Sequence, residues 1–421
     1  MASQWDPYVA RSERRFGRDP AALTSTAQAH SLGIAQRRFS VEKGDSVKAA
    51  RDAVELTREL VRMNTVNPPG SEETCARYLG ALLEDAGFQT RYHSFGEGRA
   101  NLIASLGGSA GKPPICFTGH IDTVPLGMAS WRMDPFAADS DAGKLYGRGS
   151  SDMKSGVAAF TVAALNRAQH LGGTCGVSLV ITAGEETGCE GAFHLYRAGA
   201  LGEAGAVVVA EPTSNYPLVG HKGVLWLRAK TRGVTAHGSM PERGVNAVYQ
   251  AARAVVKLEQ FRFPDPAHEL MGQATLNVGT IRGGLNINSV PDAAEIGIDI
   301  RTHPNVDHAS LVRLLAQQLG AEVELDTLMD LDAVYTKPDD PWMQSVFELA
   351  TPMAGEKPHA RAAAYFTDAA PLSRAYGNPP TVILGPGELQ MAHQTDEYCV
   401  MERVEQSVAC YEQIMLRWCQ P

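Results

Sequence analysis

The sequence predicts an α/β fold with a mostly parallel sheet, into which a ferredoxin-like unit of the order β-α-β-β-α-β is inserted. Three observations support this prediction. Apolar strands alternate with helical segments in the first half, the order changes after Gly220 to include two consecutive strands, and the alternation resumes near Asp340. We therefore expect an extension at 1–44, a first domain formed by 45–221 and 333–421, and an inserted domain at 222–332.

The first domain should begin with two amphipathic helices. Apolar residues keep helical spacing from Val47 to Val61, and the run stops at the breaker Asn-Pro-Pro-Gly at 67–70. Ser71 is expected to cap the second helix, and Gly87 to end it. Later helices are expected near 154–170, 191–200, 342–353 and 401–418, and strands at 88–93, 101–106, 115–119, 177–183, 206–210 and 381–384.

The inserted unit shows strand-like alternation and helical periodicity in turn. Two of its strands are separated by a turn that contains Gly283 and Gly284. Its elements are expected at 224–232 (strand), 245–258 (helix), 276–281 and 294–301 (strands), 308–319 (helix) and 322–328 (strand).

Composition excludes several classes of protein. The chain has 421 residues, 44% of them hydrophobic and 20% charged, which is typical of globular proteins of two to three domains. The formal charge of −9 argues against nucleic acid and anionic membranes as partners. Seven cysteines without a CxxC pair indicate reduced thiols, and no apolar run reaches the ~18 residues of a membrane span. We expect a cytoplasmic protein.

Acidic and imidazole side chains follow the predicted strands of the first domain. Taken singly, each has an ordinary explanation as a surface histidine, a helix cap or a solvated carboxylate. Together they would share one rim of the sheet, where adjacent carboxylates repel one another unless cations neutralise them. Histidine and carboxylate ligands without thiolates suit zinc, with cobalt or manganese as alternatives. The residues are His120, Asp122, Asp152, Glu185, Glu186, Glu211 and His393.

Five motifs contain these residues and are specific as a set. They are Gly-His-Ile-Asp-Thr-Val-Pro at 119–125, Gly-Arg-Gly-Ser-Ser-Asp-Met-Lys at 147–154, Gly-Glu-Glu-Thr-Gly at 184–188, Glu-Pro-Thr at 211–213, and Gly-Pro-Gly at 385–387 with Ala-His-Gln-Thr-Asp-Glu-Tyr at 392–398. The sequence from 45 to 421 resembles the M20 metallopeptidases, the family of acetylornithine deacetylase, succinyl-diaminopimelate desuccinylase and carboxypeptidase G-type enzymes. The last motif is most similar to the acetylornithine deacetylase branch.

The resemblance implies a centre of two divalent metal ions. One ion would be held by His120, Asp152 and Glu211. Asp152 would bridge to the second ion, which Glu186 and His393 would also hold.

The resemblance also assigns roles beside the ligands. Asp122 would orient His120 through its other ring nitrogen. A cis peptide would join Asp152 to Met153. Glu185 would be the general base for a water activated by the two ions.

The resemblance implies that the inserted domain serves as a lid and as a dimerisation domain. His237 would reach into the partner subunit's site, which implies a homodimer, whereas its spacing alone suggests an exposed turn histidine. Arg301 would bind a substrate carboxylate, with a surface ion pair to Asp299 or Glu295 as the alternative. Asn288 would contact substrate or simply form a turn. From the first domain, Gly385 could offer its backbone N–H to the carboxylate.

The implied activity is hydrolysis of the amide bond of an N-acyl amino acid, as in acetylornithine deacetylase. A dipeptidase or carboxypeptidase of the same family would use the same machinery. A non-catalytic binding protein is the alternative from another class, but it should have lost a ligand or the base, and none is missing. A cationic substrate side chain would need an acidic residue to pair with, and the candidates are Asp368, Asp396 and Glu397.

Overall fold

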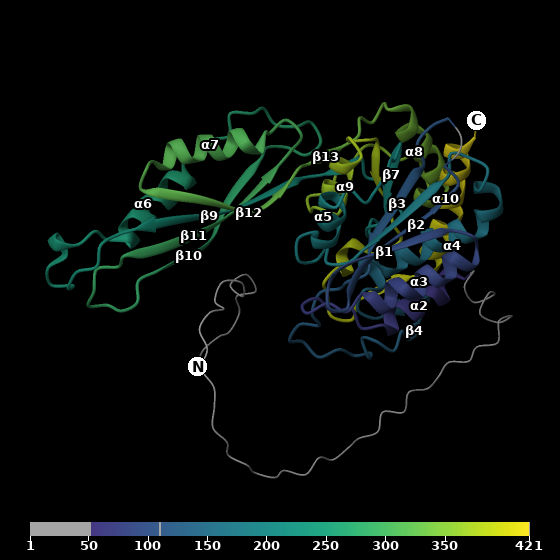
Figure 1. The fold of residues 1–421 in the computed structure, drawn as a ribbon, viewed down its shortest axis with the longest axis horizontal. Coiled ribbons are helices and arrows are strands. Elements are labelled where there is room, and N and C mark those ends of the chain that lie inside the picture. Colours follow the sequence, from purple (N-terminus) through teal and green to yellow (C-terminus); the bar gives the residue numbers. More distant parts are fainter. Residues whose placement is uncertain (1–51, 109–110, 421) are drawn as a thin grey trace, which may run out of the picture. The chain divides into compact units, whose positions relative to one another are not determined.

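Two separate β-sheets organise the chain in a computed structural model that describes residues 52–108 and 111–420 (Figure 1). The larger sheet has the strand order β1-β2-β6-β3-β7-β14, in which β6, β3, β7 and β14 run parallel and β1 and β2 are antiparallel at one edge. This mixed, mostly parallel sheet confirms the predicted α/β class. Its strands are β1 Gln89–Gly96, β2 Arg99–Leu106, β3 Ile115–His120, β6 Val177–Thr182, β7 Ala206–Val209 and β14 Thr381–Ile383.

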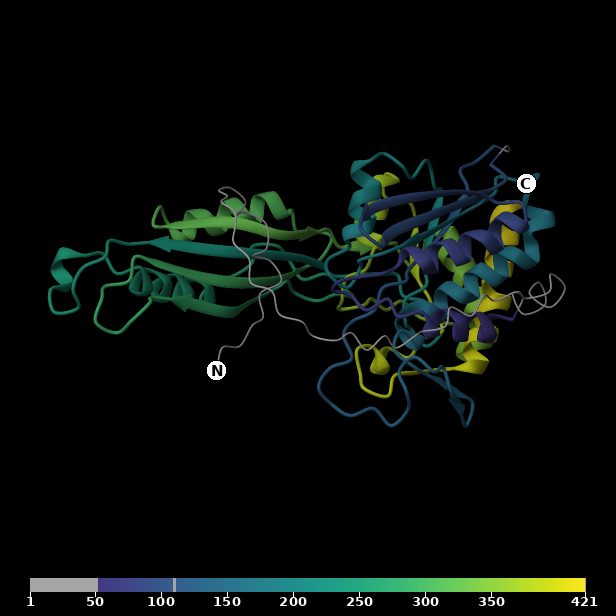
Figure 2. The ribbon, with the colours of Figure 1, turned by 60° about the horizontal axis from the view of Figure 1, so that its bottom comes forward.

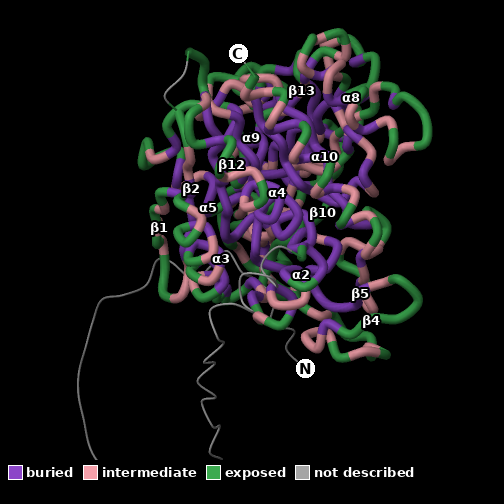
Figure 3. Tube along the Cα trace, turned by 90° about the vertical axis from the view of Figure 1, so that its right-hand side faces the viewer, coloured by how far each residue is buried: buried purple, intermediate pink, exposed green. Residues whose placement is uncertain are grey.

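Helices cover both faces of this sheet because its central strands are apolar on both sides. In β3, Phe117 belongs to one apolar cluster and its neighbour Cys116 to another, as the alternation of a strand requires. Figure 2 shows the helices that pack around this sheet, and Figure 3 shows that the buried residues lie in the middle of the trace and the exposed ones mostly at its margin. The Phe117 side has α2 Ala53–Arg62, α3 Glu73–Asp85, α4 Ser155–Leu171, α8 Pro341–Ala354 and α10 Met401–Cys419, and the other has α5 Glu190–Arg197 and α9 Ala369–Ala375.

The second sheet is antiparallel throughout and has the order β10-β11-β9-β12. Its alternating pattern is clearest in β11, where Ala294, Ile296, Ile298 and Ile300 are buried against a separate apolar cluster. Helices α6 and α7 and strand β9 also contribute residues to that cluster (Figure 1). The elements follow the predicted β-α-β-β-α-β succession: β9 Gly223–Arg232, α6 Ala247–Glu259, β10 Thr275–Gly283, β11 Ala293–Thr302, α7 His308–Leu319 and β12 Val323–Leu331.

The four strands of the second sheet lie within the predicted range 222–332, but the domain limits themselves stay a prediction. The expected extension at 1–44 lies outside the described residues. Within the described ranges, no helix combines the length and apolar character needed to cross a bilayer.

The predicted cap of α3 is wrong. The cap position is Glu72 rather than Ser71, and no side chain caps the helix. Glu72 is buried and pairs with Arg99 at 2.9 Å, while the N–H of Glu73 donates to the backbone oxygen of Gly98. Contacts with β2 and the turn before it therefore set the start of α3, and these long-range contacts outweigh the local preference for serine.

Several very short elements were not predicted. Strands β4 Ser140–Asp141, β5 Lys144–Tyr146 and β15 Tyr398–Val400 form a three-stranded sheet, and β8 Gly220–His221 pairs with β13 Val334–Tyr335. Two or three residues carry too little periodicity to identify a strand.

Phe117→Ala should lower the free energy of unfolding by about 3–5 kcal/mol, because it leaves a cavity in the larger core. The ring is fully buried, and its centroid lies 6.2 Å from that of Phe160 and 5.4 Å from that of Tyr411. Urea denaturation followed by circular dichroism measures the effect. Met128→Ala is the control, since Met128 is fully exposed. A loss below about 1 kcal/mol for Phe117→Ala would show that this core tolerates the cavity.

Candidate metal centre

The candidate ligands reach one rim because the parallel strands end at the same edge of the sheet. His120 is the last residue of β3, and Glu211 follows the end of β7. Glu186 lies in the loop after β6, and Asp152 lies in the tight turn Ser150–Lys154 that opens α4. His393 comes from the loop between β14 and β15.

Asp152 lies between the two histidines and presents one carboxylate oxygen to each. Its Oδ1 is 3.1 Å from Nε2 of His120, and its Oδ2 is 3.4 Å from Nε2 of His393. Nε2 of His120 also lies 3.9 Å from Oε2 of Glu211, and Nε2 of His393 lies 3.0 Å from Oε2 of Glu186. The five predicted ligands thus converge, and atoms of His120, Asp152 and Glu186 lie within 4.8 Å of one another.

The backbone around Asp152 is unusual. The Asp152–Met153 peptide bond is cis, as predicted. Gly149 precedes the turn with φ at 84°, and a Cβ at this position would lie 2.5 Å from a methyl carbon of Thr123. Glycine is therefore required where this loop enters the site.

Asp122 organises more of the centre than predicted. Nδ1 of His120 lies 3.0 Å from the backbone oxygen of Asp122 and 3.5 Å from its Oδ1. The Asp122 carboxylate also accepts the backbone N–H groups of Glu185 and Glu186, at 3.1 and 3.2 Å, and Nδ2 of Asn67 at 3.0 Å. It therefore links the histidine to the glutamate loop. The sequence reasoning missed Asn67, whose signal was its place in the Asn-Pro-Pro-Gly breaker.

The electrostatics of this cluster fit divalent cations. Burial raises the pKa of Glu185 and Glu211 well above the ordinary value, and repulsion among the carboxylates adds to the effect. Hydrogen bonds to Asp152 and Glu186 raise the pKa of His393 to about 10. Oε1 of Glu186 is buried and has no hydrogen-bond partner among the described residues. A set of crowded buried carboxylates with two histidines is the donor set that zinc and similar ions take.

Three other predicted residues lie on the inserted unit. His237 and Asn288 are exposed neighbours, since His237 bridges to Ser289 and the N–H of Gly238 donates to the backbone oxygen of Asn288 at 2.7 Å. Arg301 forms the ion pair with Asp299 that was the alternative reading, at 3.0 Å. In the described part of the chain, no hydrogen bond or ion pair joins His237, Asn288 or Arg301 to the ligand cluster.

The expectation for Gly385 needs correction. Its backbone N–H already donates to Oγ1 of Thr213 at 3.1 Å and is not free for a substrate carboxylate. A Cβ here would lie 2.2 Å from the backbone oxygen of Ala210. The glycine therefore allows a close approach of two backbones beside Glu211.

Two of the acidic candidates for a cationic substrate group already have cationic partners. Asp396 pairs at the surface with Arg132 at 2.9 Å. Glu397 is fully buried and pairs with Arg148 at 2.7 Å. Asp368 is buried near the centre. Its Oδ2 accepts a hydrogen bond from Oγ1 of Thr182 at 2.5 Å, and its Oδ1 has no hydrogen-bond partner among the described residues.

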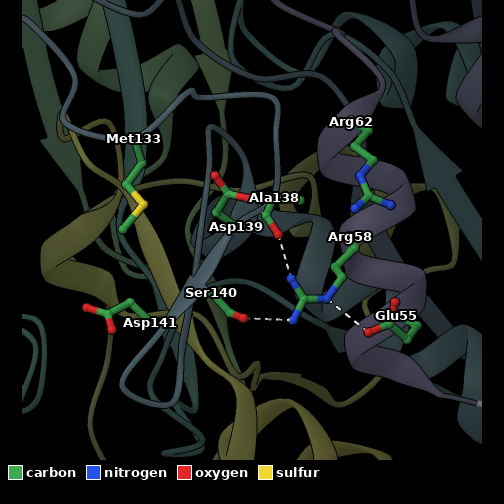
Figure 4. Close-up of a pocket in the computed structure, with 8 residues that line it drawn as sticks. All are labelled: Glu55, Arg58, Arg62, Met133, Ala138, Asp139, Ser140 and Asp141. Atoms are coloured by element: carbon green, nitrogen blue, oxygen red, sulfur yellow. Dashed lines mark hydrogen bonds and ion pairs between the residues drawn. The ribbon is translucent and has the colours of Figure 1, made fainter.

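A hollow of about 740 Å³ lies between α2 and β4 and is lined by none of the candidate ligands (Figure 4). Its Arg58 is already bonded to Glu55 at 2.9 Å, to the backbone oxygen of Ala138 at 2.5 Å and to Ser140 at 3.1 Å (Figure 4). The arginine is engaged, so we assign no function to this hollow.

Sequence comparison agrees with the geometry. Residues 116–417 match the sequence profile of Peptidase family M20/M25/M40. The chain belongs to this family. An acetylornithine deacetylase of Proteus mirabilis is 32% identical over 386 residues, which cover 87% of this chain and 96% of that protein. A probable succinyl-diaminopimelate desuccinylase of Staphylococcus epidermidis is 30% identical over 386 residues, covering 84% and 94%.

Solved structures of the M20 family share the fold. The metallo-carboxypeptidase Sso-CP2 of Sulfolobus solfataricus superimposes with a TM-score of 0.72 at 18% identity, over 86% of this chain and 98% of that one. The YXEP protein of Bacillus subtilis, described as a dinuclear metal binding peptidase, gives 0.65 at 17% identity, over 88% and 99%. The chain is thus an M20-family metallohydrolase.

Proposed function

We propose that this chain hydrolyses the amide bond of an N-acyl amino acid at a centre of two divalent ions. The observation that carries the proposal is the placement of Asp152, whose two oxygens face His120 and His393 separately. His120, Asp152 and Glu211 would hold one ion, and Asp152, Glu186 and His393 the other. Zinc suits these donors, and cobalt or manganese could replace it.

Glu185 is the group available for proton transfer. It is buried and lies in the loop after β6, and among the described residues its carboxylate accepts only a weak hydrogen bond from Sγ of Cys189, at 3.9 Å. Divalent ions bound beside it would polarise the amide carbonyl and lower the pKa of the attacking water. Glu185 would take the proton of that water and return it to the departing amine, which is a poor leaving group without it.

The relatives favour an N-acyl amino acid as the substrate. The two relatives described above are named as a deacetylase and a desuccinylase, names that describe removal of an acyl group. Arg301 would exchange its pair with Asp299 for the substrate carboxylate, since the guanidinium fork matches a carboxylate. Asn288 would add a polar contact from the same unit.

The inserted unit would act as a lid and form a homodimer. Leu285 and Ile287 in the loop after β10 are exposed by 98% and 104%, although both are apolar. Strand β10 is an edge of its sheet and is largely exposed along its length. A second copy would cover these features and bring His237 to the partner's site, where it would help to bind the oxyanion.

Removal of metal tests this proposal. Dialysis against a chelator should abolish hydrolysis, and zinc, cobalt or manganese should restore it, with two ions bound per chain.

The reactivated enzyme is then assayed on N-acetyl, N-succinyl and N-formyl amino acids and on dipeptides. We expect the N-acyl amino acids to be cleaved best. A preference for dipeptides would favour the dipeptidase alternative, and full activity after chelation would contradict the metal centre. A fully active monomer would exclude the role of His237.

A further inference from the structure

We propose that Glu397 is a positioning residue that fixes Asp152 relative to His393, and so sets the geometry of both ion sites at once. The proposal rests on the metal centre proposed above. It gives Glu397 a role different from the substrate contact considered from the sequence, because the side chain is fully buried and cannot meet a substrate group.

The Glu397 carboxylate binds the backbone of the Asp152 turn at three points. Its Oε1 accepts the N–H groups of Ser151 and Asp152, at 2.8 and 2.9 Å. Its Oε2 accepts the N–H of Gly149 at 2.9 Å and Nη1 of Arg148 at 2.7 Å. Both oxygens therefore accept two hydrogen bonds, which uses the full capacity of an ionised carboxylate. One of the donors is the amide of the bridging ligand itself.

The same contacts tie the Asp152 turn to the segment that carries His393. Glu397 lies four residues after His393, and its backbone oxygen accepts the N–H of Gly147 at 2.9 Å. Oγ of Ser151 donates to the backbone oxygen of Tyr398 at 2.6 Å. Strand β15 then pairs with β5, which leads into the turn. The two ligands are remote in sequence but share one hydrogen-bonded frame.

Arg148 completes this frame. Its side chain is 2% exposed, and besides Glu397 it donates to the backbone oxygens of Gln394 at 3.3 Å and Pro125 at 3.2 Å. Gln394 is the neighbour of His393, and Pro125 belongs to the loop that begins at His120. The guanidinium therefore contacts the loop that follows His120 and the loop that carries His393, and through Glu397 it is linked to the Asp152 turn, while its charge balances the buried carboxylate.

A purely structural ion pair would stabilise the fold without any specific effect on metal. The contacts argue for more than that, because the three amides bound by Glu397 belong to Asp152 itself and to two residues just before it in the chain. Groups that orient ligands in this way usually affect metal affinity when they are changed. Loss of Glu397 should therefore weaken metal binding in a chain that still folds.

The test compares full-length Glu397→Gln with the wild type and with Glu402→Gln, the same substitution at an exposed position at the start of α10. Glutamine keeps the shape of glutamate, but its amide nitrogen would face two of the N–H donors that now meet an oxygen. Affinity for zinc is measured by competition with a coloured chelator, and the cobalt forms are compared by absorption spectroscopy. Circular dichroism checks the fold.

We expect Glu397→Gln to bind zinc about 10–100-fold more weakly. Its cobalt spectrum should change, its kcat should fall at saturating metal, and its KM should stay near that of the wild type. Glu402→Gln should match the wild type in every measurement. If Glu397→Gln does not fold, the same measurements are made on Glu397→Asp. Aspartate keeps the negative charge opposite Arg148 but is too short to reach both ends of the turn, so it should also weaken zinc binding.

The outcomes separate the two proposals. Wild-type protein that binds no zinc would contradict the metal centre itself. Wild-type protein that binds two ions, together with a Glu397 variant that has the same affinity and cobalt spectrum, would overturn only the role of Glu397.

Discussion

Glu185→Gln should keep its bound metal and lose turnover, with kcat falling by about 10²–10⁴-fold. The substitution preserves the shape of the side chain but removes its ability to accept and return a proton. Glu185 is buried and contacts none of the candidate ligands by hydrogen bond within the described residues, so metal content should not change. The measurements are kcat for the best N-acyl amino acid and the number of ions per chain by elemental analysis.

Glu203→Gln is a suitable control for this prediction, because Glu203 is exposed in the loop before β7. It should retain wild-type turnover and metal content. A Glu185→Gln protein with near wild-type kcat would remove Glu185 from the reaction. One that has lost its ions would indicate that Glu185 supports a ligand instead, and the proton acceptor would have to be sought elsewhere, with buried Asp368 as the first candidate.

The convergence of the candidate ligands could be predicted because it follows from chain order. His120 ends β3 and Glu211 lies two residues after β7, and these strands pair in parallel, so the sheet places both residues at the same edge. The hydrophobic periodicity of the sequence also predicted the limits of most strands and helices to within a few residues. The arrangement is therefore largely a consequence of local pattern and topology.

The partners of the buried charges could not be predicted in the same way. Glu397 accepts amides that lie 245 to 248 residues earlier in the chain, and no local pattern identifies which amides will be left without a partner. Glu72 shows the same limit, because its pairing with Arg99 overrides the cap expected at Ser71. Arg301 is a contrasting case. Its partner Asp299 is two residues away on the same face of a strand, and the sequence offered this pair as the alternative to a substrate contact.

Asp152→Asn should disable both ion sites, with metal content falling from two ions per chain to less than one. Asp152 is the candidate ligand that contacts both histidines in the described structure. Asparagine offers one neutral oxygen, and its NH₂ group faces the second site with hydrogen atoms rather than lone pairs. Because bound ions supply several kcal/mol of transition-state stabilisation, turnover should fall by about 10³-fold or more.

Comparison with His393→Ala makes this prediction specific to a bridging role. His393 contacts Glu186 and one oxygen of Asp152, so its removal should weaken one site and leave His120, Asp152 and Glu211 to hold the other ion. Asp152→Asn should therefore lose more metal than His393→Ala, whereas exposed Asp141→Asn should lose none. Equal losses in the first two variants would mean that the sites fill together. An Asp152→Asn protein that keeps one tightly bound ion would mean that Asp152 serves a single site, and the two-ion assignment would then need another bridging ligand.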